Sequence, residues 1–296
     1  WTVSAELRRQ KDTDITGVLT TKPTQVEESN TLPRGIIRFK PTKSTNLYVS
    51  WSKGLLAPQV NAQLATATPR EFAKYQAQFV NAVAIVAGDQ LKMWEIGWKQ
   101  QFLDNRAFFN IDYYNGTWKN QKGRAVALIQ EDCGSVSHGT SNAASGCPNG
   151  PDGSQAVNPN GTPFFNSRNV NIGGDSKLWG VEAEGAMQIN ERWDVHANLT
   201  WAKSEYDSFF FNFVAPIAGF SQMKGNSNAR FPDWMGYIGS TYKAPFRGEW
   251  NWFLGGDVNY TGKTKVDESN LAYCKGFYTA NAQLGLEKSG LRLEAF

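Results

Sequence analysis

The stretch LKMWEIGWKQQFLDNRAFFNIDYYNGTW, residues 91–118, decides the fold because it reads as two strands joined by a tight turn. Side chains alternate between the two sides of a strand. In the first strand, one side is apolar and carries Trp94, Ile96 and Trp98. In the second strand, the apolar side carries Ala107, Phe109, Ile111 and Tyr113. Residues 103–105 between the strands include the Asp and Asn that tight turns favour. The stretch predicts an antiparallel hairpin.

The same alternation recurs along the chain and predicts further strands at residues 1–9, 36–39, 47–51, 178–189, 193–201, 234–243, 250–260, 278–286 and 291–296. Residues 10–32 are polar and show no clear pattern. Long connections are expected at residues 54–90, 119–176 and 207–231, with a shorter one at 262–275 and a helix within 69–87.

From residue 40 onward, short and long connections alternate along the chain. An outer-membrane barrel has this order, because short turns lie at one rim and long loops at the other. Aromatic residues near the strand ends match two interfacial girdles. A secreted all-β protein is the alternative, but such continuous apolar faces would need a second sheet to cover them. The pattern favours an all-β fold, an antiparallel transmembrane β-barrel.

The composition excludes other classes. Lys and Arg number 30 against 27 Asp and Glu, which gives no electrostatic argument for nucleic-acid binding. The chain contains no run of about 18 apolar residues, so no transmembrane helix is predicted. The mean hydropathy of −0.47 does not argue against a barrel, because alternating strands average near neutral.

Several short motifs, taken in order, resemble those of TonB-dependent outer-membrane receptors. Residues 94–99 (WEIGWK), 103–106 (LDNR) and 110–114 (NIDYY) are similar to a hairpin motif of that family. Residues 180–184 (GVEAE) resemble the strand that follows it, and residues 46–54 (NLYVSWSKG) resemble the strand before it. Pro232 in the triplet RFP sits where these receptors often carry a proline before a descending strand. The resemblance covers about residues 33–296.

The resemblance implies a barrel of about 22 strands with a plugged lumen. This chain, with about a dozen strand candidates, would be a fragment of that larger barrel. Residues 1–296 are then one partial barrel domain, without the plug domain, the TonB box or the native C-terminus. We expect the natural end downstream, because Arg292 and Glu294 share the register of Phe296.

The function implied by the resemblance is active, TonB-dependent uptake of a scarce nutrient across the outer membrane of a Gram-negative bacterium, by a multi-pass barrel. The implied partners are the TonB complex, acting through the plug and TonB box, outer-membrane lipid, and a small nutrient such as a ferric siderophore. Cobalamin or an oligosaccharide stays an alternative ligand. A passive porin-type channel and an adhesive barrel are alternatives of other classes. The sequence shows no catalytic triad, phosphate loop or metal-ligand cluster, so no enzyme activity, metal or cofactor is expected.

Two of the three cysteines, Cys133 and Cys147, lie in the second long connection. A disulfide is expected between them if that loop is extracellular, since the compartment is oxidising. Unpaired thiols are the alternative, and a zinc site is disfavoured because only His138 is near. Cys274 is left without an assigned partner.

Two further groups are candidate site residues. The third long connection should expose an aromatic cluster for ligand contact, with packing of the loop as an equal alternative: Phe209, Phe210, Phe211 and Phe213. The polar strand faces should line the lumen with Glu95, Asp112, Glu182, Glu184 and His196. Paired carboxylates could suggest acid–base catalysis, but a plugged lumen needs polar walls, so we expect them to bind plug side chains or water.

Overall fold

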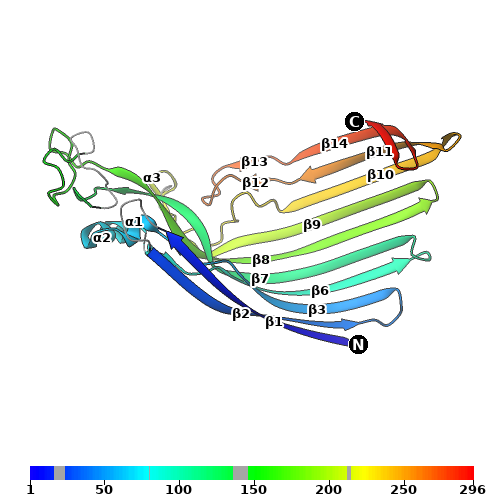
Figure 1. Cartoon of the computed structure of the whole chain (residues 1–296), viewed down its shortest axis with the longest axis horizontal. Helices are drawn as coiled ribbons and strands as arrows, with labels where there is room; N and C mark the ends of the chain where they lie inside the picture. Colours follow the sequence, from blue (N-terminus) through cyan, green and yellow to red (C-terminus); the bar gives the residue numbers. More distant parts are fainter. Residues whose placement is uncertain (17–23, 80, 136–145, 212–214) are drawn as a thin grey trace.

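The computed structural model describes residues 1–16, 24–79, 81–135, 146–211 and 215–296. Eleven long strands pair in chain order into one antiparallel sheet (Figure 1). These are β1 (Thr2–Thr16), β2 (Thr24–Phe39), β3 (Thr45–Leu55), β6 (Gln90–Phe102), β7 (Ala107–Ile129), β8 (Asn166–Asn190), β9 (Trp193–Ser208), β10 (Trp234–Arg247), β11 (Trp250–Thr261), β14 (Phe277–Lys288) and β15 (Leu291–Ala295). The sheet ends at β1 and β15, so the wall it forms is open. The antiparallel all-β prediction is confirmed.

The short turns lie at one end of the sheet and the long connections at the other (Figure 1). The turn between β6 and β7 places Leu103, Asp104 and Asn105 at φ values of 51°, 53° and 69°. Asp and Asn tolerate this left-handed region better than most residues, so the predicted turn is confirmed.

Most strands are longer than the sequence predicted, and three differ most. β2 begins at Thr24 instead of residue 36, and β7 and β8 extend through much of the expected loop 119–176. The β7–β8 register shifts between Trp118 and Gln121. Because such a bulge moves the following side chains to the other face, the alternation of β7 breaks at this point and the strand looks as if it ends.

The outer face of the sheet carries an apolar band bounded by aromatic rows. On the loop side, Trp201 and Trp234 are register partners with ring centroids 6.3 Å apart. On the turn side, Tyr242 lies 5.5 Å from Trp252. Trp234 and Tyr242 are eight residues apart on one strand, about 26 Å at the rise of a strand. At the strand tilt of about 35–45° in outer-membrane barrels, that length spans roughly 20 Å of membrane thickness, close to their apolar band of roughly 25 Å.

Small elements occupy the long connections. Residues 56–89 contain β4 (Gln59–Val60), α1 (Ala62–Ala65), α2 (Pro69–Gln78) and β5 (Ile85–Val86). The helix predicted within 69–87 is present but ends at Gln78. The other connections contain α3 (Ala215–Ala218), β12 (Thr264–Lys265) and β13 (Tyr273–Cys274). Among the described segments, no helix combines the length and apolarity needed to cross a membrane.

Candidate ligand-binding site

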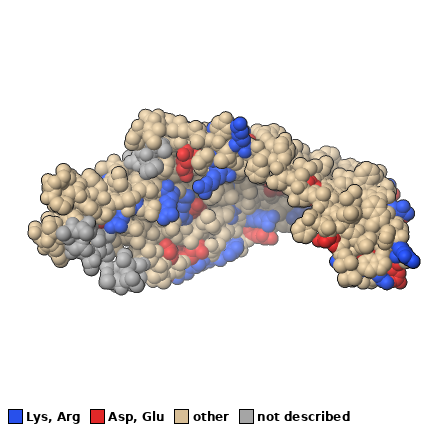
Figure 2. All heavy atoms as spheres, turned by 90° about the horizontal axis from the view of Figure 1, so that it is seen from above, with Lys and Arg blue, Asp and Glu red and all other residues tan. Residues whose placement is uncertain are grey.

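The inner face of the sheet brings four of the predicted carboxylates together. In the β7–β8 register, Asp112 lies directly opposite Glu182 and Asn110 lies opposite Glu184. Gly97 of β6 is the register partner of Asp112. Glu95 lies two residues from Gly97 on β6, so its side chain is on the same inner face. Figure 2 shows charged side chains of both signs inside the hollow of the molecule. The strands therefore form a polar inner wall with an acidic patch on β6, β7 and β8.

Hydrogen bonds hold part of this patch in place. The Tyr48 hydroxyl donates to the carboxylate of Glu95. Asn110 donates from Nδ2 to Oε1 of Glu184 at 2.7 Å. The ring of Tyr48 lies over Gly97, where a β-carbon would collide with it. The sequence pointed to Glu95 and missed Tyr48, although Tyr48 stands on the polar face of its strand.

His196 stands apart from the acidic patch. It lies opposite Ala186 on β8 and opposite Gly239 on β10. Its Nε2 is 2.8 Å from the hydroxyl of Tyr237. The histidine is thus placed on the inner face, as expected, in a pair with tyrosine.

The loops fold over the inner side of the extended β7 and β8. Val170 and Ile172 are fully buried, and they share the even-numbered side of β8 with Glu182. They belong to one core with Tyr75 of α2 and Phe79. The connection between β3 and β6 therefore packs on the inner side of the wall, on the loop side of the acidic patch.

The phenylalanine cluster is mostly inside this core. Phe209 is 2% exposed and Phe211 is 9% exposed, so the predicted exposure of these two rings is wrong. Gly123 and Gly174 leave the space that the Phe209 ring occupies, because a β-carbon at either would collide with it. The packing alternative describes both rings, since burial removes apolar area from water.

Phe210, which lies between Phe209 and Phe211 in the sequence, is only partly buried. Contact between the phenylalanines and a ligand stays a prediction. Of the described phenylalanines in this cluster, Phe210 is the one that is accessible enough to make it. Phe213 lies outside the residues that the structure describes.

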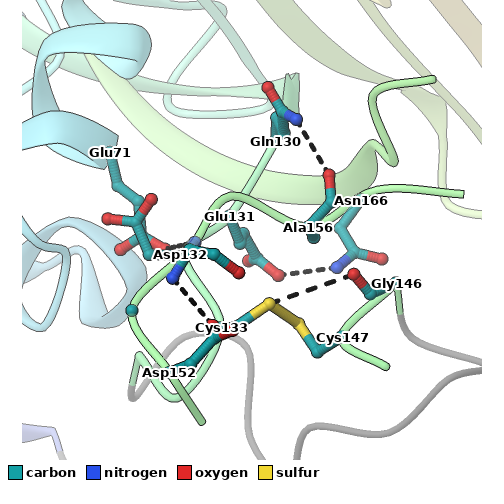
Figure 3. The surroundings of a disulfide bond; sticks show 12 residues. Glu71, Gln130, Glu131, Asp132, Cys133, Gly146, Cys147, Asp152, Ala156 and Asn166 are labelled. Carbon is teal, nitrogen blue, oxygen red and sulfur yellow. Dashed lines mark hydrogen bonds between the residues drawn. A yellow bond between two sulfur atoms is a disulfide. The ribbon is translucent and has the colours of Figure 1, made fainter. Parts of the chain in front are cut away.

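A buried polar network joins two of the loops (Figure 3). The side chain of Thr68 caps α2 and forms a capping box with Glu71. Glu71 is fully buried, and its Oε1 accepts a hydrogen bond from the backbone nitrogen of Asp132 at 2.7 Å. Asp132 in turn forms an ion pair of 2.7 Å with Arg70 and accepts from Thr68 Oγ1 at 2.6 Å. The start of α2 and the start of loop 130–165 are thereby tied together.

A second buried ion pair lies beside the first network. Glu131 is 0% exposed and binds the guanidinium of Arg168, with 2.7 Å between Oε2 and Nη2. Asn166 donates to the same oxygen at 2.6 Å. Such charges are held by partners because an unpaired buried charge is costly. Glu131 thus fixes the base of the loop to the start of β8.

Burial also changes the electrostatics of α2. Desolvation lowers the pKa of Lys74, whose Nζ donates to the carbonyl of Gln130 at 2.8 Å. Burial raises the pKa of Tyr75, and the charge of Glu131 adds to this effect. Both groups lie where the helix packs on β7 and β8, which is a region of low effective dielectric.

The disulfide between Cys133 and Cys147 is present, as predicted, with Cα atoms 5.7 Å apart (Figure 3). Both cysteines are buried beside Ala156 and Phe164. Residues 136–145, which include His138, lie outside the described ranges. Cys274 has an exposed free thiol. In the part of the chain that the structure describes, no group of three or more His, Cys, Asp or Glu could hold a metal ion.

The fold is similar to that of solved uptake and siderophore receptors. The ferric yersiniabactin uptake receptor FyuA from Yersinia pestis is 12% identical, with a TM-score of 0.59 over 96% of this chain and 35% of that receptor. The ferric preacinetobactin receptor BauA from Acinetobacter baumannii is 14% identical, with a TM-score of 0.60 over 97% of this chain and 34% of that receptor. The siderophore receptor PiuA from Acinetobacter baumannii is 15% identical, with a TM-score of 0.60 over 99% and 35%.

The chain thus spans about a third of the length of these solved receptors. No curated protein matches it in sequence. The model of the family described as TonB dependent receptor-like, beta-barrel, matches residues 1–295. The chain therefore belongs to the family of TonB-dependent receptors.

Proposed function

We propose that residues 1–296 form part of the barrel of a receptor that takes up a scarce nutrient across the outer membrane of a Gram-negative bacterium. The observation that carries this proposal is the family match over almost the whole chain. The family is one of receptors and transporters.

A ferric siderophore is the proposed ligand. Its support is the similarity in fold to receptors for ferric yersiniabactin and ferric preacinetobactin and to a siderophore receptor. A neighbour with a TM-score of 0.57 is described as a copper transporter, so copper is the ligand class to test beside iron. Loops that fold inward over a polar wall suit a ligand that is captured at the loop end and passed to the lumen.

The acidic patch has a role in the same proposal. Asp112 and Glu182 are direct cross-strand neighbours, and like charges in this position repel. Lys99 of β6, the register partner of Asn110, supplies one cation on the same inner face, and further cations would balance the rest of the patch. We assign this balance to basic side chains of the plug domain, which would sit against β6, β7 and β8 in the complete receptor and respond to the TonB complex.

The test is uptake by cells with and without the full-length gene, in the presence and absence of a proton uncoupler. Radioactive ferric siderophores and copper are supplied in parallel. The proposal expects iron uptake that needs both the gene and the proton gradient. Uptake that persists with the uncoupler would indicate a passive channel instead. Uptake of copper but not of iron would show that copper is the ligand, and the protein would still be a receptor of the proposed class.

A further inference from the structure

Two lysines face each other on the outer side of the sheet. Lys53 of β3 is the direct register partner of Lys92 of β6. Two residues closer to the short turns on the same strands, Trp51 is the register partner of Trp94. Since side chains two residues apart share a face, all four side chains lie on the outer face. Trp51 is 41% exposed and Trp94 is 44% exposed, as expected of side chains that meet lipid.

The position of this pair relative to the membrane follows from the apolar band. Below the two tryptophans, toward the short turns, the outer face continues with Val49 and Ile96, which are 47% and 50% exposed. Aromatic residues at the edge of such a band mark the headgroup layer. The lysines therefore lie at headgroup height on the loop side, which is the outer leaflet if the proposed function is right.

The charges around the two lysines are not balanced. Other lysines near the loop end have carboxylate partners, with Lys119 at 2.6 Å from Asp175 and Lys177 at 2.9 Å from Asp207. For Lys53 and Lys92, the described ranges contain no salt bridge or hydrogen bond of the side chain. Directly opposed like charges destabilise a strand pair. An anion between the two ammonium groups would remove this repulsion.

A third residue completes the surface. Thr117 of β7 is the register partner of Lys92 on one side and of Lys177 on the other. Its hydroxyl can donate a hydrogen bond to the same anion. Two ammonium groups and a hydroxyl in one row across adjacent strands suit the oxygens of a phosphate, each of which accepts hydrogen bonds.

We propose that Lys53, Lys92 and Thr117 bind a phosphate group of lipid A in the outer leaflet. This inference rests on the proposed function for its orientation in the membrane. The surface faces sideways from the wall and lies directly above exposed apolar residues. A phosphorylated glycolipid fits both parts, because its phosphate reaches the lysines while its acyl chains cover the band from Trp51 to Val49. Free phosphate would contact only Lys53, Lys92 and Thr117 and would leave the apolar residues beside them uncovered.

The test uses the full-length receptor, purified in detergent and titrated with lipid A in native mass spectrometry. The variant Lys53→Gln/Lys92→Gln removes both charges. Its lipid A affinity is expected to fall about thirtyfold, since each lysine near an anionic surface contributes about fivefold. The matched control is Lys40→Gln/Lys43→Gln, which removes two exposed charges beside the turn at the opposite rim and should bind lipid A as the wild type does.

Further arms separate the sources of phosphate and the folding of the variant. Dephosphorylated lipid A should bind the wild type and the double variant equally. Inorganic phosphate in excess should not displace lipid A, and displacement would overturn the lipid assignment. Lys53→Arg/Lys92→Arg should keep the affinity, which shows that a loss in the Gln variant is one of charge. Equal affinity of wild type and Gln variant for lipid A would overturn the proposal.

The two proposals can fail separately. Lipid binding is measured on the purified receptor without any nutrient ligand, whereas the proposed function is measured by uptake in cells. A receptor that imports no iron or copper but binds lipid A through the two lysines would contradict only the uptake proposal. A receptor that imports iron but binds lipid A without them would contradict only this one.

Discussion

The carboxylate of Glu71 in α2 accepts a hydrogen bond from the backbone nitrogen of Asp132, 61 positions later in the chain, at 2.7 Å. Its second oxygen accepts from the backbone nitrogen of Thr68 at 2.9 Å. One buried side chain thus closes the helix N-terminus and holds the start of loop 130–165. The two loops are therefore joined through this carboxylate as well as through the bonds of Asp132 to Thr68 and Arg70.

We expect Glu71→Gln to loosen both loops, because an amide group has one acceptor oxygen where the carboxylate has two. A buried donor left without a partner costs about 1–3 kcal/mol. Hydrogen exchange in the full-length receptor should speed up in peptides covering Thr68 and Asp132. The exposed turn residue Glu191 supplies the control, and Glu191→Gln should exchange like the wild type. Unchanged exchange in Glu71→Gln would contradict the link.

The disulfide should stabilise the same loop independently. Cys133 and Cys147 are separated by 14 positions, and a closed loop of about 15 residues gives about 3 kcal/mol in the chain-entropy model. Cys133→Ser/Cys147→Ser is expected to make residues 130–165 more sensitive to limited proteolysis while the sheet stays folded. Cys274→Ser, which removes the exposed thiol, should leave the cleavage rate unchanged. Equal rates in all three proteins would show that the disulfide does not order the loop.

Two neighbouring phenylalanines should behave differently. Phe209 packs at 4.7 Å from the ring of Tyr206 and is almost fully buried, so Phe209→Ala should cost about 3–5 kcal/mol locally. Hydrogen exchange should increase in α2 and in the first part of β8, around residues 170–174. Phe210→Ala should leave exchange unchanged and weaken ligand binding, measured by titration calorimetry once the ligand is known. Faster exchange in Phe210→Ala would mean that its ring is also part of the core.

Gly97 on the inner wall and Gly35 on the outer face give a paired glycine test. A β-carbon at Gly97 would collide with the ring of Tyr48, whereas a β-carbon at Gly35 meets nothing within 4 Å. Gly97→Ala should therefore displace Tyr48 from Glu95 and cost about 1–3 kcal/mol, as overpacking does. The temperature at which the folded band disappears in electrophoresis should fall for Gly97→Ala. It should stay near the wild-type value for Gly35→Ala, and a similar fall in both would refute the argument.

The outer face of the sheet was predictable because its cause is local. Alternation in the run from Trp94 to Trp98 needs only the two-residue period of a strand, and the turn at residues 103–105 needs only residues that tolerate positive φ. The same period placed Glu95, Glu182 and Glu184 on the inner side. The pairing of Cys133 with Cys147 was also open to prediction, since the two lie close in sequence in one loop.

The sequence by itself therefore determined where most strands lie and which of their faces is apolar, because both follow from local side-chain period and turn chemistry. Only the tertiary structure decided which residues of neighbouring strands and loops lie opposite each other. The bulge after Trp118 extended β7, the register placed Lys53 against Lys92, and the fold of the loop buried Phe209. These outcomes depend on contacts between residues far apart in the chain, and loops carry no period from which such contacts can be read.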